Sequence, residues 1–155
     1  MAQFQDFLKP LLKTDDYSVT PLAGDASTRR YYRIISDKQT WILMEWEPFE
    51  KIGDFPFLSV QKYFGEQGVS VPEINSYDKT TGLFLLEDLG DLTLERRFWE
   101  FQNQEFVLPF YEKSLDELIK IHSQVFLDKE EKVCTAYQIE FSVEKLLWEL
   151  NYAKK

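Results

Sequence analysis

The chain contains the stretch Leu22-Ala23-Gly24-Asp25-Ala26-Ser27-Thr28-Arg29-Arg30-Tyr31-Tyr32-Arg33-Ile34. This stretch predicts a short strand, a tight turn of small residues, and a second strand that carries arginines and tyrosines. Successive backbone N–H groups in such a turn can converge on an anion, and the planar guanidinium group fits phosphate oxygens. The residues alone leave two interpretations open: a loop that binds phosphates, or a surface hairpin with solvated arginines.

The flanking sequence extends this hairpin to a five-stranded sheet with one packed helix. The strands are expected at residues 18–22, 30–35, 40–45, 73–77 and 83–87. Between the third and fourth strands, apolar residues at helical spacing predict a helix that ends at Gly68 in a left-handed cap. A short helix precedes the sheet, and Pro10 is expected to delay, kink or end it. These elements predict an α+β fold built on an antiparallel sheet.

The chain after Asp91 is predicted to be helical. Helices are expected over residues 92–101, 106–126 and 142–155. Ser142 is a typical N-cap for the last of them. The middle helix is expected to pack along one face, which consists of Leu115, Leu118, Ile119, His122 and Val125. The last helix is expected to bury Leu146, Leu147 and Leu150.

Composition narrows the classes of function. A net charge of −9 disfavours nucleic acid as a partner, because a phosphate backbone would be repelled. The longest apolar runs have only strand length, so no membrane partner is expected. No signal peptide is predicted at the start, and Cys134 is the single cysteine, which together favour a cytoplasmic protein. Aromatic residues make up 16% of the chain, and most of those in its middle are expected in the core.

Four blocks of sequence carry a resemblance to a known family. They are Gly24-Asp25-Ala26-Ser27 with Arg29-Arg30-Tyr31-Tyr32-Arg33, Trp41-Ile42-Leu43-Met44, Val69-Ser70-Val71-Pro72-Glu73-Ile74, and Leu85-Leu86-Glu87-Asp88-Leu89-Gly90-Asp91. In these blocks the chain resembles the aminoglycoside-phosphotransferase-like kinases, which have a protein-kinase-like fold. Within that family it is most similar to the bacterial branch that includes the anomeric N-acetylmuramate/N-acetylglucosamine kinases of cell-wall recycling. The resemblance extends from about residue 8 to the end.

The resemblance implies that the chain has two parts. Residues 1–88 would form the small lobe of a kinase-like fold, and residues 89–155 the hinge and the first helices of a truncated large lobe. At the hinge, backbone groups of Glu87 and Leu89 would pair with adenine. The implied phosphate-binding residues are Gly24, Asp25, Ala26, Ser27, Thr28, Arg29 and Arg30.

The third strand departs from the general kinase pattern. A lysine that pairs with phosphates is expected near Met44, yet residues 39–50 contain none. We expect Arg29 or Arg30 to supply the positive charge instead, with Arg30 favoured. The partner glutamate on the following helix is not evident, since Glu66 falls near the end of that helix.

The catalytic residues of such a kinase are expected outside this chain. An aspartate in a His-x-Asp loop would orient the substrate hydroxyl, and a second aspartate would hold Mg²⁺. The single histidine, His122, is instead followed by Ser123 and Gln124, and we expect it to be a helix-face residue without a catalytic role. Asp25 is expected to be a solvated turn residue rather than a metal ligand.

The sequence therefore predicts the ATP-binding half of a small-molecule kinase that acts on a sugar hydroxyl, with ATP and Mg²⁺ as cofactors. Alone, the chain is expected to bind nucleotide weakly, to transfer no phosphoryl group, and to self-associate through its C-terminal helices. Two other interpretations stay open: a non-catalytic scaffold that keeps the lobe, and a pseudokinase-like nucleotide sensor. The sequence does not specify the substrate.

Overall fold

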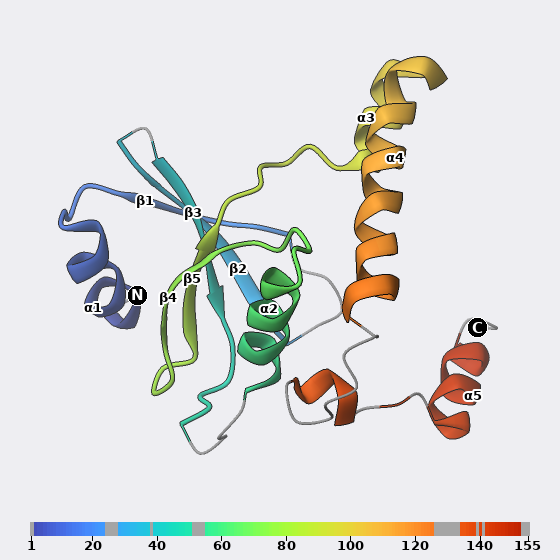
Figure 1. The fold of residues 1–155 in the computed structure, drawn as a ribbon. Helices are drawn as coiled ribbons and strands as arrows, with labels where there is room; N and C mark the ends of the chain where they lie inside the picture. The colour runs from blue at the N-terminus through green and yellow to red at the C-terminus, as the bar shows by residue number, and fades with distance from the viewer. Residues whose placement is uncertain are drawn as a thin grey trace.

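The architecture is an antiparallel sheet with one helix on each face, followed in the chain by a group of helices (Figure 1). A computed structural model describes residues 2–23, 28–37, 39–50, 55–125, 134–138, 140 and 142–152. The turn residues Gly24, Asp25, Ala26 and Ser27 lie outside the described residues.

The sheet has five strands. They are β1 (Ser18–Pro21), β2 (Arg30–Ser36), β3 (Gln39–Glu45), β4 (Ile74–Asp78) and β5 (Leu83–Glu87). Their spatial order is β1-β2-β3-β5-β4, and every neighbouring pair is antiparallel. The five predicted strands and the meander of the first three are confirmed, because short apolar runs bounded by polar turns or glycine mark the strands in the sequence.

A tight turn over residues 78–82 joins β4 to β5. The Asp78 carboxylate accepts hydrogen bonds from the Thr80 N–H (2.9 Å) and the Thr81 hydroxyl (2.8 Å). Gly82 has a φ of +70°, and a Cβ at this position would lie 2.3 Å from the Trp46 carbonyl oxygen. Only glycine fits this backbone without a clash.

Both faces of the sheet are buried. Helix α1 (Ala2–Leu12) inserts Leu8 into one apolar cluster, which also contains Ile34, Leu43, Leu83 and Leu85. Helix α2 (Pro56–Glu66) covers the opposite face, where the buried residues are Met44, Phe49, Phe55, Phe84 and Leu86. We call these the α1 face and the α2 face. The prediction of a single packed helix was therefore wrong, because the apolar stripe of α1 also packs on the sheet.

The C-terminal ends of α1 and α2 can be compared with their predictions. Helix α1 continues through Pro10 to Leu12, because Pro10 lies on the exposed side, where water can replace the lost hydrogen bond. Gly68, directly after α2 and its cap, has a φ of +75°, which confirms the predicted left-handed end.

The second part of the chain consists of helices. They are α3 (Leu94–Phe101), α4 (Gln104–Lys120), the π-helix η1 (Ile121–Val125), the 3-10 helix η2 (Thr135–Gln138) and α5 (Val143–Tyr152). Ser142 caps α5, since its hydroxyl accepts a hydrogen bond from the Lys145 N–H (3.2 Å). The predicted 106–126 helix begins at Gln104 and ends as an α-helix at Lys120, where the wider π-turns begin.

The helical part buries less than its sequence predicts. Leu146, Leu147 and Leu150 of α5 are 47%, 53% and 62% exposed, so the prediction that they are buried was wrong. On the predicted packed face of α4 and η1, only Val125 is buried. Half of the mid-chain aromatic residues are also exposed; these are Phe98, Trp99, Phe101, Phe106 and Tyr111. Within the described residues, these apolar stripes have too few neighbours to be covered.

Two polar contacts join α4 and η1 to the sheet part. Glu117 of α4 accepts hydrogen bonds from the N–H and the hydroxyl of Ser70, both at 2.9 Å. The hydroxyls of Tyr63 and Tyr137 both donate to the carbonyl of Val125, with Tyr63 at 3.1 Å. These contacts fix the end of α4 near α2.

Candidate functional site

A half-buried apolar surface lies on the α2 face of the first three strands. Leu22, Tyr31 and Ile42 form it, and the Leu22 N–H donates to the Tyr31 carbonyl at 2.9 Å. Arginines lie at one end of this surface, and the segment after β5 lies at the other, since Trp41 of β3 pairs with Glu87 and Glu45 pairs with Arg30. A strand rises roughly 3.3 Å per residue, so the two ends of this surface are more than about 10 Å apart.

At the arginine end, Arg29 and Arg30 point to different faces. The Arg29 guanidinium lies 5.0 Å from the centre of the Trp46 ring, which packs with the α2-face cluster. Arg30 lies opposite Glu45, whose carboxylate accepts a hydrogen bond from Tyr32 on the α1 face. The alternation predicted for the two arginines is therefore observed, but Arg29 rather than the favoured Arg30 shares the α2 face.

A hollow of about 300 Å³ adjoins these residues. It is lined by Thr28, Arg30, Glu45, Trp46, Glu47 and Pro48. Two carboxylates and one guanidinium border it, so its charge is mixed.

Met44 occupies the position at which the kinase pattern places a lysine. Its side chain is completely buried among the rings of Phe49, Phe55 and Phe84. An ammonium group at this position would lose its water without gaining a partner carboxylate in that cluster. The absence of lysine from the third strand therefore fits the packing.

The segment over residues 87–91 leaves the sheet at the other end of the surface. The Glu87 N–H donates to the Glu73 carbonyl (2.9 Å), and the Glu87 carboxylate accepts from the Glu73 N–H (3.1 Å). Leu89 is 69% exposed, and Gly90 turns the chain with a φ of +79°. Glu87 is thus held by the sheet, whereas Leu89 lies at the surface.

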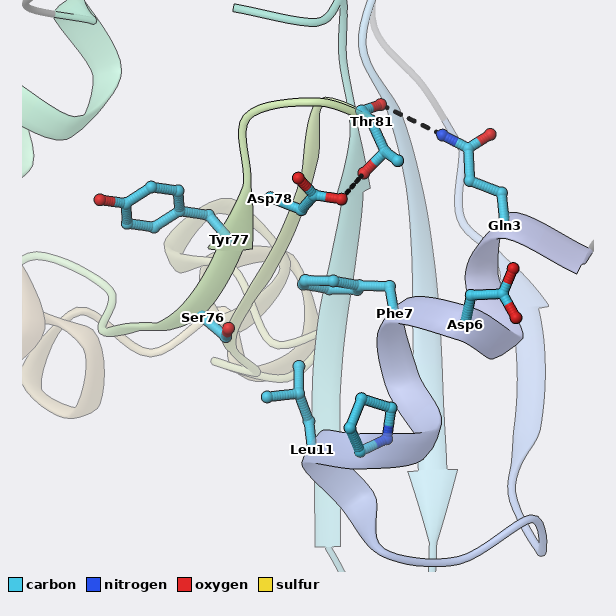
Figure 2. A pocket seen from close by; sticks show the side chains of 9 residues that line it. Gln3, Asp6, Phe7, Leu11, Ser76, Tyr77, Asp78 and Thr81 are labelled. Carbon is cyan, nitrogen blue, oxygen red and sulfur yellow. Dashed lines mark hydrogen bonds between the residues drawn. The ribbon is translucent and has the colours of Figure 1, made fainter. Parts of the chain in front are cut away.

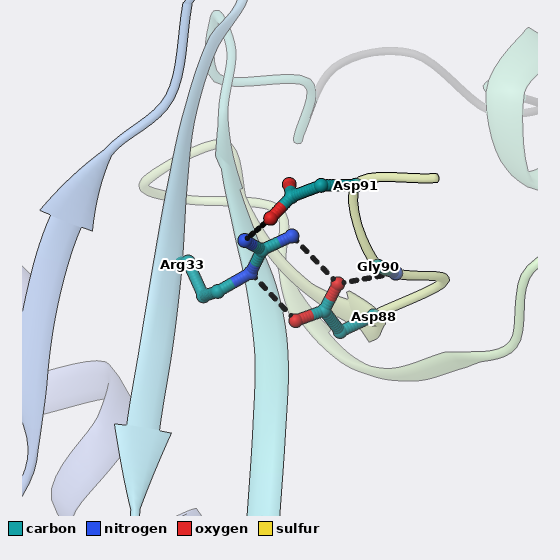
Figure 3. Close-up of polar contacts among 4 residues, drawn as sticks. All are labelled: Arg33, Asp88, Gly90 and Asp91. Atoms are coloured by element: carbon teal, nitrogen blue, oxygen red, sulfur yellow. Dashed lines mark hydrogen bonds and ion pairs between the residues drawn. The ribbon is translucent and has the colours of Figure 1, made fainter. Parts of the chain in front are cut away.

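Arg33 of β2 anchors this segment through two carboxylates (Figure 3). Its Nε and Nη2 atoms lie 2.7 and 3.1 Å from the two oxygens of Asp88, and its Nη1 atom lies 2.7 Å from Asp91. Asp88 also accepts a hydrogen bond from the Gly90 N–H at 2.9 Å. We call Arg33, Asp88 and Asp91 the arginine clamp.

Electrostatics keeps the arginine clamp fully ionised at neutral pH. Hydrogen bonds with Asp91 and Asp88 raise the pKa of Arg33. Burial alone would raise the pKa of Asp88, but hydrogen bonds from Arg33, Gly90 and Thr40 outweigh it and lower the pKa. The hydrogen bond from Arg33 also lowers the pKa of Asp91. This contact was not predicted from the sequence, because only the β2–β3–β5 register brings Arg33 close to Asp88.

Comparison with curated proteins gives a consistent result. A kinase of Caulobacter vibrioides is 30% identical over 128 residues, which cover 66% of this chain and 34% of the relative. A kinase of Neisseria meningitidis is 28% identical over 120 residues, which cover 77% of this chain and 35% of the relative. A kinase of Pseudomonas aeruginosa is 36% identical over 73 residues, which cover 47% of this chain and 21% of the relative. All three are named N-acetylmuramate/N-acetylglucosamine kinase.

This chain is similar to the N-acetylmuramate/N-acetylglucosamine kinases over part of its length. It spans about a third of the length of the first two of these relatives. No protein-family profile matches the sequence. The predicted resemblance to the N-acetylmuramate/N-acetylglucosamine kinases is thereby confirmed.

A hollow on the α2 face is almost wholly apolar. It has a volume of about 390 Å³ and is lined by Trp46, Pro56, Phe57, Val60, Gln61, Val71, Pro72 and Leu86. The Gln61 amide is turned away to the Pro72 carbonyl, at 3.0 Å. An apolar, concave wall of this kind suits a flat organic ring.

A hollow of about 530 Å³ lies between α1 and the turn after β4, near the α1 face (Figure 2). The Gln3 amide donates to the Thr81 carbonyl (3.3 Å), and Asp78 accepts from the Thr81 hydroxyl. The first bond joins α1 to the turn, and the second lies within the turn. None of the residues implied for nucleotide binding lines this hollow.

Among the described residues, no three or more His, Cys, Asp or Glu side chains are grouped so that they could hold a metal ion. His122 lies exposed on η1. No helix in the described part of the chain is long and apolar enough to cross a membrane.

Proposed function

We propose that this chain forms the nucleotide-binding part of an ATP-dependent kinase that phosphorylates an amino sugar such as N-acetylmuramate or N-acetylglucosamine. One observation carries the proposal: a chain related to such kinases has the strand order β1-β2-β3-β5-β4, with α2 between β3 and β4. In this proposal, residues 1–88 are the small lobe of a kinase-like fold. Residues 89–155 are the hinge and the first helices of a larger helical lobe.

The adenine ring would lie against the apolar surface of Leu22, Tyr31 and Ile42. Burial of a flat ring between apolar side chains supplies affinity, and a few backbone groups at its edge supply specificity. The carbonyl of Glu87 and the N–H of Leu89 would be those groups. Leu89 supports this role because it lies outside the sheet and is exposed, so its backbone N–H is not used in a strand pairing.

The triphosphate would extend from the hinge toward the turn at residues 24–28. Backbone N–H groups of that turn and the guanidinium of Arg29 would bind its oxygens. We choose Arg29 over Arg30 because Arg29 shares the α2 face with the apolar surface. ATP supplies the phosphoryl group, and we assign no residue of this chain to Mg²⁺.

The test is a titration of the 155-residue chain with ATP, followed by NMR. We expect weak binding that shifts the resonances of Tyr31, Ile42 and Leu89. Gly24→Val and Arg29→Ala should each weaken ATP binding by about tenfold, the effect of losing one charge-assisted hydrogen bond. Lys9→Ala is the matched control, since it removes a cation from an exposed ion pair on α1.

Two outcomes would contradict the proposal. One is the absence of any ATP-dependent shift at millimolar nucleotide. The other is binding that shifts only residues of the α1 face. A parallel assay with N-acetylmuramate and N-acetylglucosamine measures phosphoryl transfer, and we expect none from this chain alone.

A further inference from the structure

The arginine clamp joins two parts of the proposed site that are 55 residues apart in sequence. Arg33 comes from the middle of β2, whereas Asp88 and Asp91 belong to the segment that leaves β5. The Arg33 and Asp88 side chains are only 17% and 5% exposed, so this ion pair is shielded from solvent and from salt. The contact with Asp91 is at the surface, because Asp91 is 65% exposed.

The geometry of the clamp restrains direction as well as distance. Two parallel N–H···O bonds between Arg33 and Asp88 fix the plane of the carboxylate. The third bond, to Asp91, fixes the chain on the other side of Leu89 and Gly90. The Gly90 N–H donates to Asp88 and closes the turn between them.

The clamped segment is otherwise weakly held. The sheet ends at Glu87, and Leu89 is too exposed to fix the path of the chain by packing. Polar contacts of Asp88 and Asp91 therefore define where the backbone of Leu89 lies; Arg33 makes three of them, and Thr40 of β3 adds a side-chain hydrogen bond to Asp88. A lysine in place of Arg33 would keep the charge but lose the planar, two-pronged contact.

We propose that Arg33 is a positioning residue that sets the selectivity of the hinge for adenine over guanine. This inference rests on the proposed function, in which backbone groups of Glu87 and Leu89 read the base. Adenine and guanine exchange donor and acceptor positions at the edge that faces such groups. Discrimination between them therefore requires the Leu89 N–H to stay in one place, which is the effect of the clamp.

The experiment compares ATP and GTP affinities of the 155-residue chain by NMR titration. Arg33→Ala should weaken ATP binding by about tenfold, the effect of misplacing one hydrogen bond, and should leave GTP binding nearly unchanged. The ratio of the ATP affinity to the GTP affinity, which we call the ATP:GTP ratio, should therefore fall by about tenfold. Asp88→Asn should lower the ratio in the same direction, and Arg33→Lys should restore part of it.

Two controls separate positioning from loss of stability. Leu8→Ala opens a cavity on the opposite, α1 face and should lower the melting temperature without changing the ATP:GTP ratio. Lys9→Ala removes a cation from an exposed pair and should change neither. If wild type prefers ATP and Arg33→Ala keeps that preference, the inference is overturned while the proposed function stands. If wild type binds no ATP, the proposed function fails first.

Discussion

Replacing Met44 by lysine tests why this chain lacks the lysine that the kinase pattern places on the third strand. Met44 is completely buried on the α2 face, in contact with the aromatic cluster of Phe49, Phe55 and Phe84. If that packing is correct, the substitution introduces an amine into an apolar interior. If the position instead borders the nucleotide, a lysine there should be tolerated.

The cost follows from the titration of the new side chain. An unfolded lysine has a pKa of about 10.4, whereas buried lysines titrate near about 5–6, so the folded chain would hold a neutral amine at pH 7. Removing the proton costs about 1.36 kcal/mol for each pH unit below 10.4, which gives about 4.6 kcal/mol at pH 7. Because the folded pKa lies below the unfolded pKa, this penalty shrinks as the pH rises toward 10.4.

The assay is urea unfolding at pH 7, 8 and 9, followed by tryptophan fluorescence. Met44→Lys should lose about 4.6 kcal/mol at pH 7 and regain about 1.36 kcal/mol per pH unit. Met44→Leu, which conserves volume, should lose less than about 1.5 kcal/mol at every pH. A Met44→Lys chain that matches Met44→Leu at pH 7 and shows no pH dependence would refute the reasoning, since the amine must then reach water.

Three other substitutions probe separate contacts. In urea unfolding, Gly82→Ala should lower the free energy of unfolding by about 2 kcal/mol or more beyond the loss caused by Gly90→Ala. Both glycines have a positive φ, but only at Gly82 would the new Cβ meet a backbone carbonyl oxygen, at 2.3 Å. Equal losses would contradict the clash. A hydrogen bond with Lys120 and others from the loop before β4 hold the pKa of Glu117 at about 2, below its ordinary 4.5. The stability that these hydrogen bonds give is present above pH 4.5 and is lost as the pH falls toward 2. The melting temperature of Glu117→Gln should therefore change less between pH 5 and pH 3 than that of wild type. An equal change in both proteins would contradict this role of Glu117. The exposed apolar face of α5 should mediate self-association, which Leu147→Glu should abolish in sedimentation; a wild-type monomer at the same concentration would exclude it.

The sheet was predictable because local sequence marks where each strand begins and ends. Alternating side chains, a polar turn or a glycine bound every strand, and Gly68 marks the end of α2 for a purely steric reason. The chain order of the elements then left few ways to pair the strands. The similarity to the N-acetylmuramate/N-acetylglucosamine kinases was also recognisable from local sequence, since each of its four blocks is a short continuous stretch.

The arginine clamp and the burial of the C-terminal helices were not predictable in the same way. Arg33 meets Asp88 only through the register of three strands, which no local pattern specifies. For α5, helical spacing shows that Leu146, Leu147 and Leu150 share a stripe, but spacing does not show what covers it. The ranking of Arg29 and Arg30 depended on knowing which face of the sheet α2 occupies.

The apolar character of β5 has a consequence for how the sheet assembles. Leu83, Phe84, Leu85 and Leu86 are all buried, so a slip of β5 by one residue would exchange one apolar set for another with little loss of burial. Hydrophobic pattern therefore does not specify the register of this central strand. The turn over residues 78–82, with its Asp78 hydrogen bonds and Gly82, specifies it instead. Damage to that turn should thus yield misaligned β-sheet and aggregation during refolding, rather than a local loop defect.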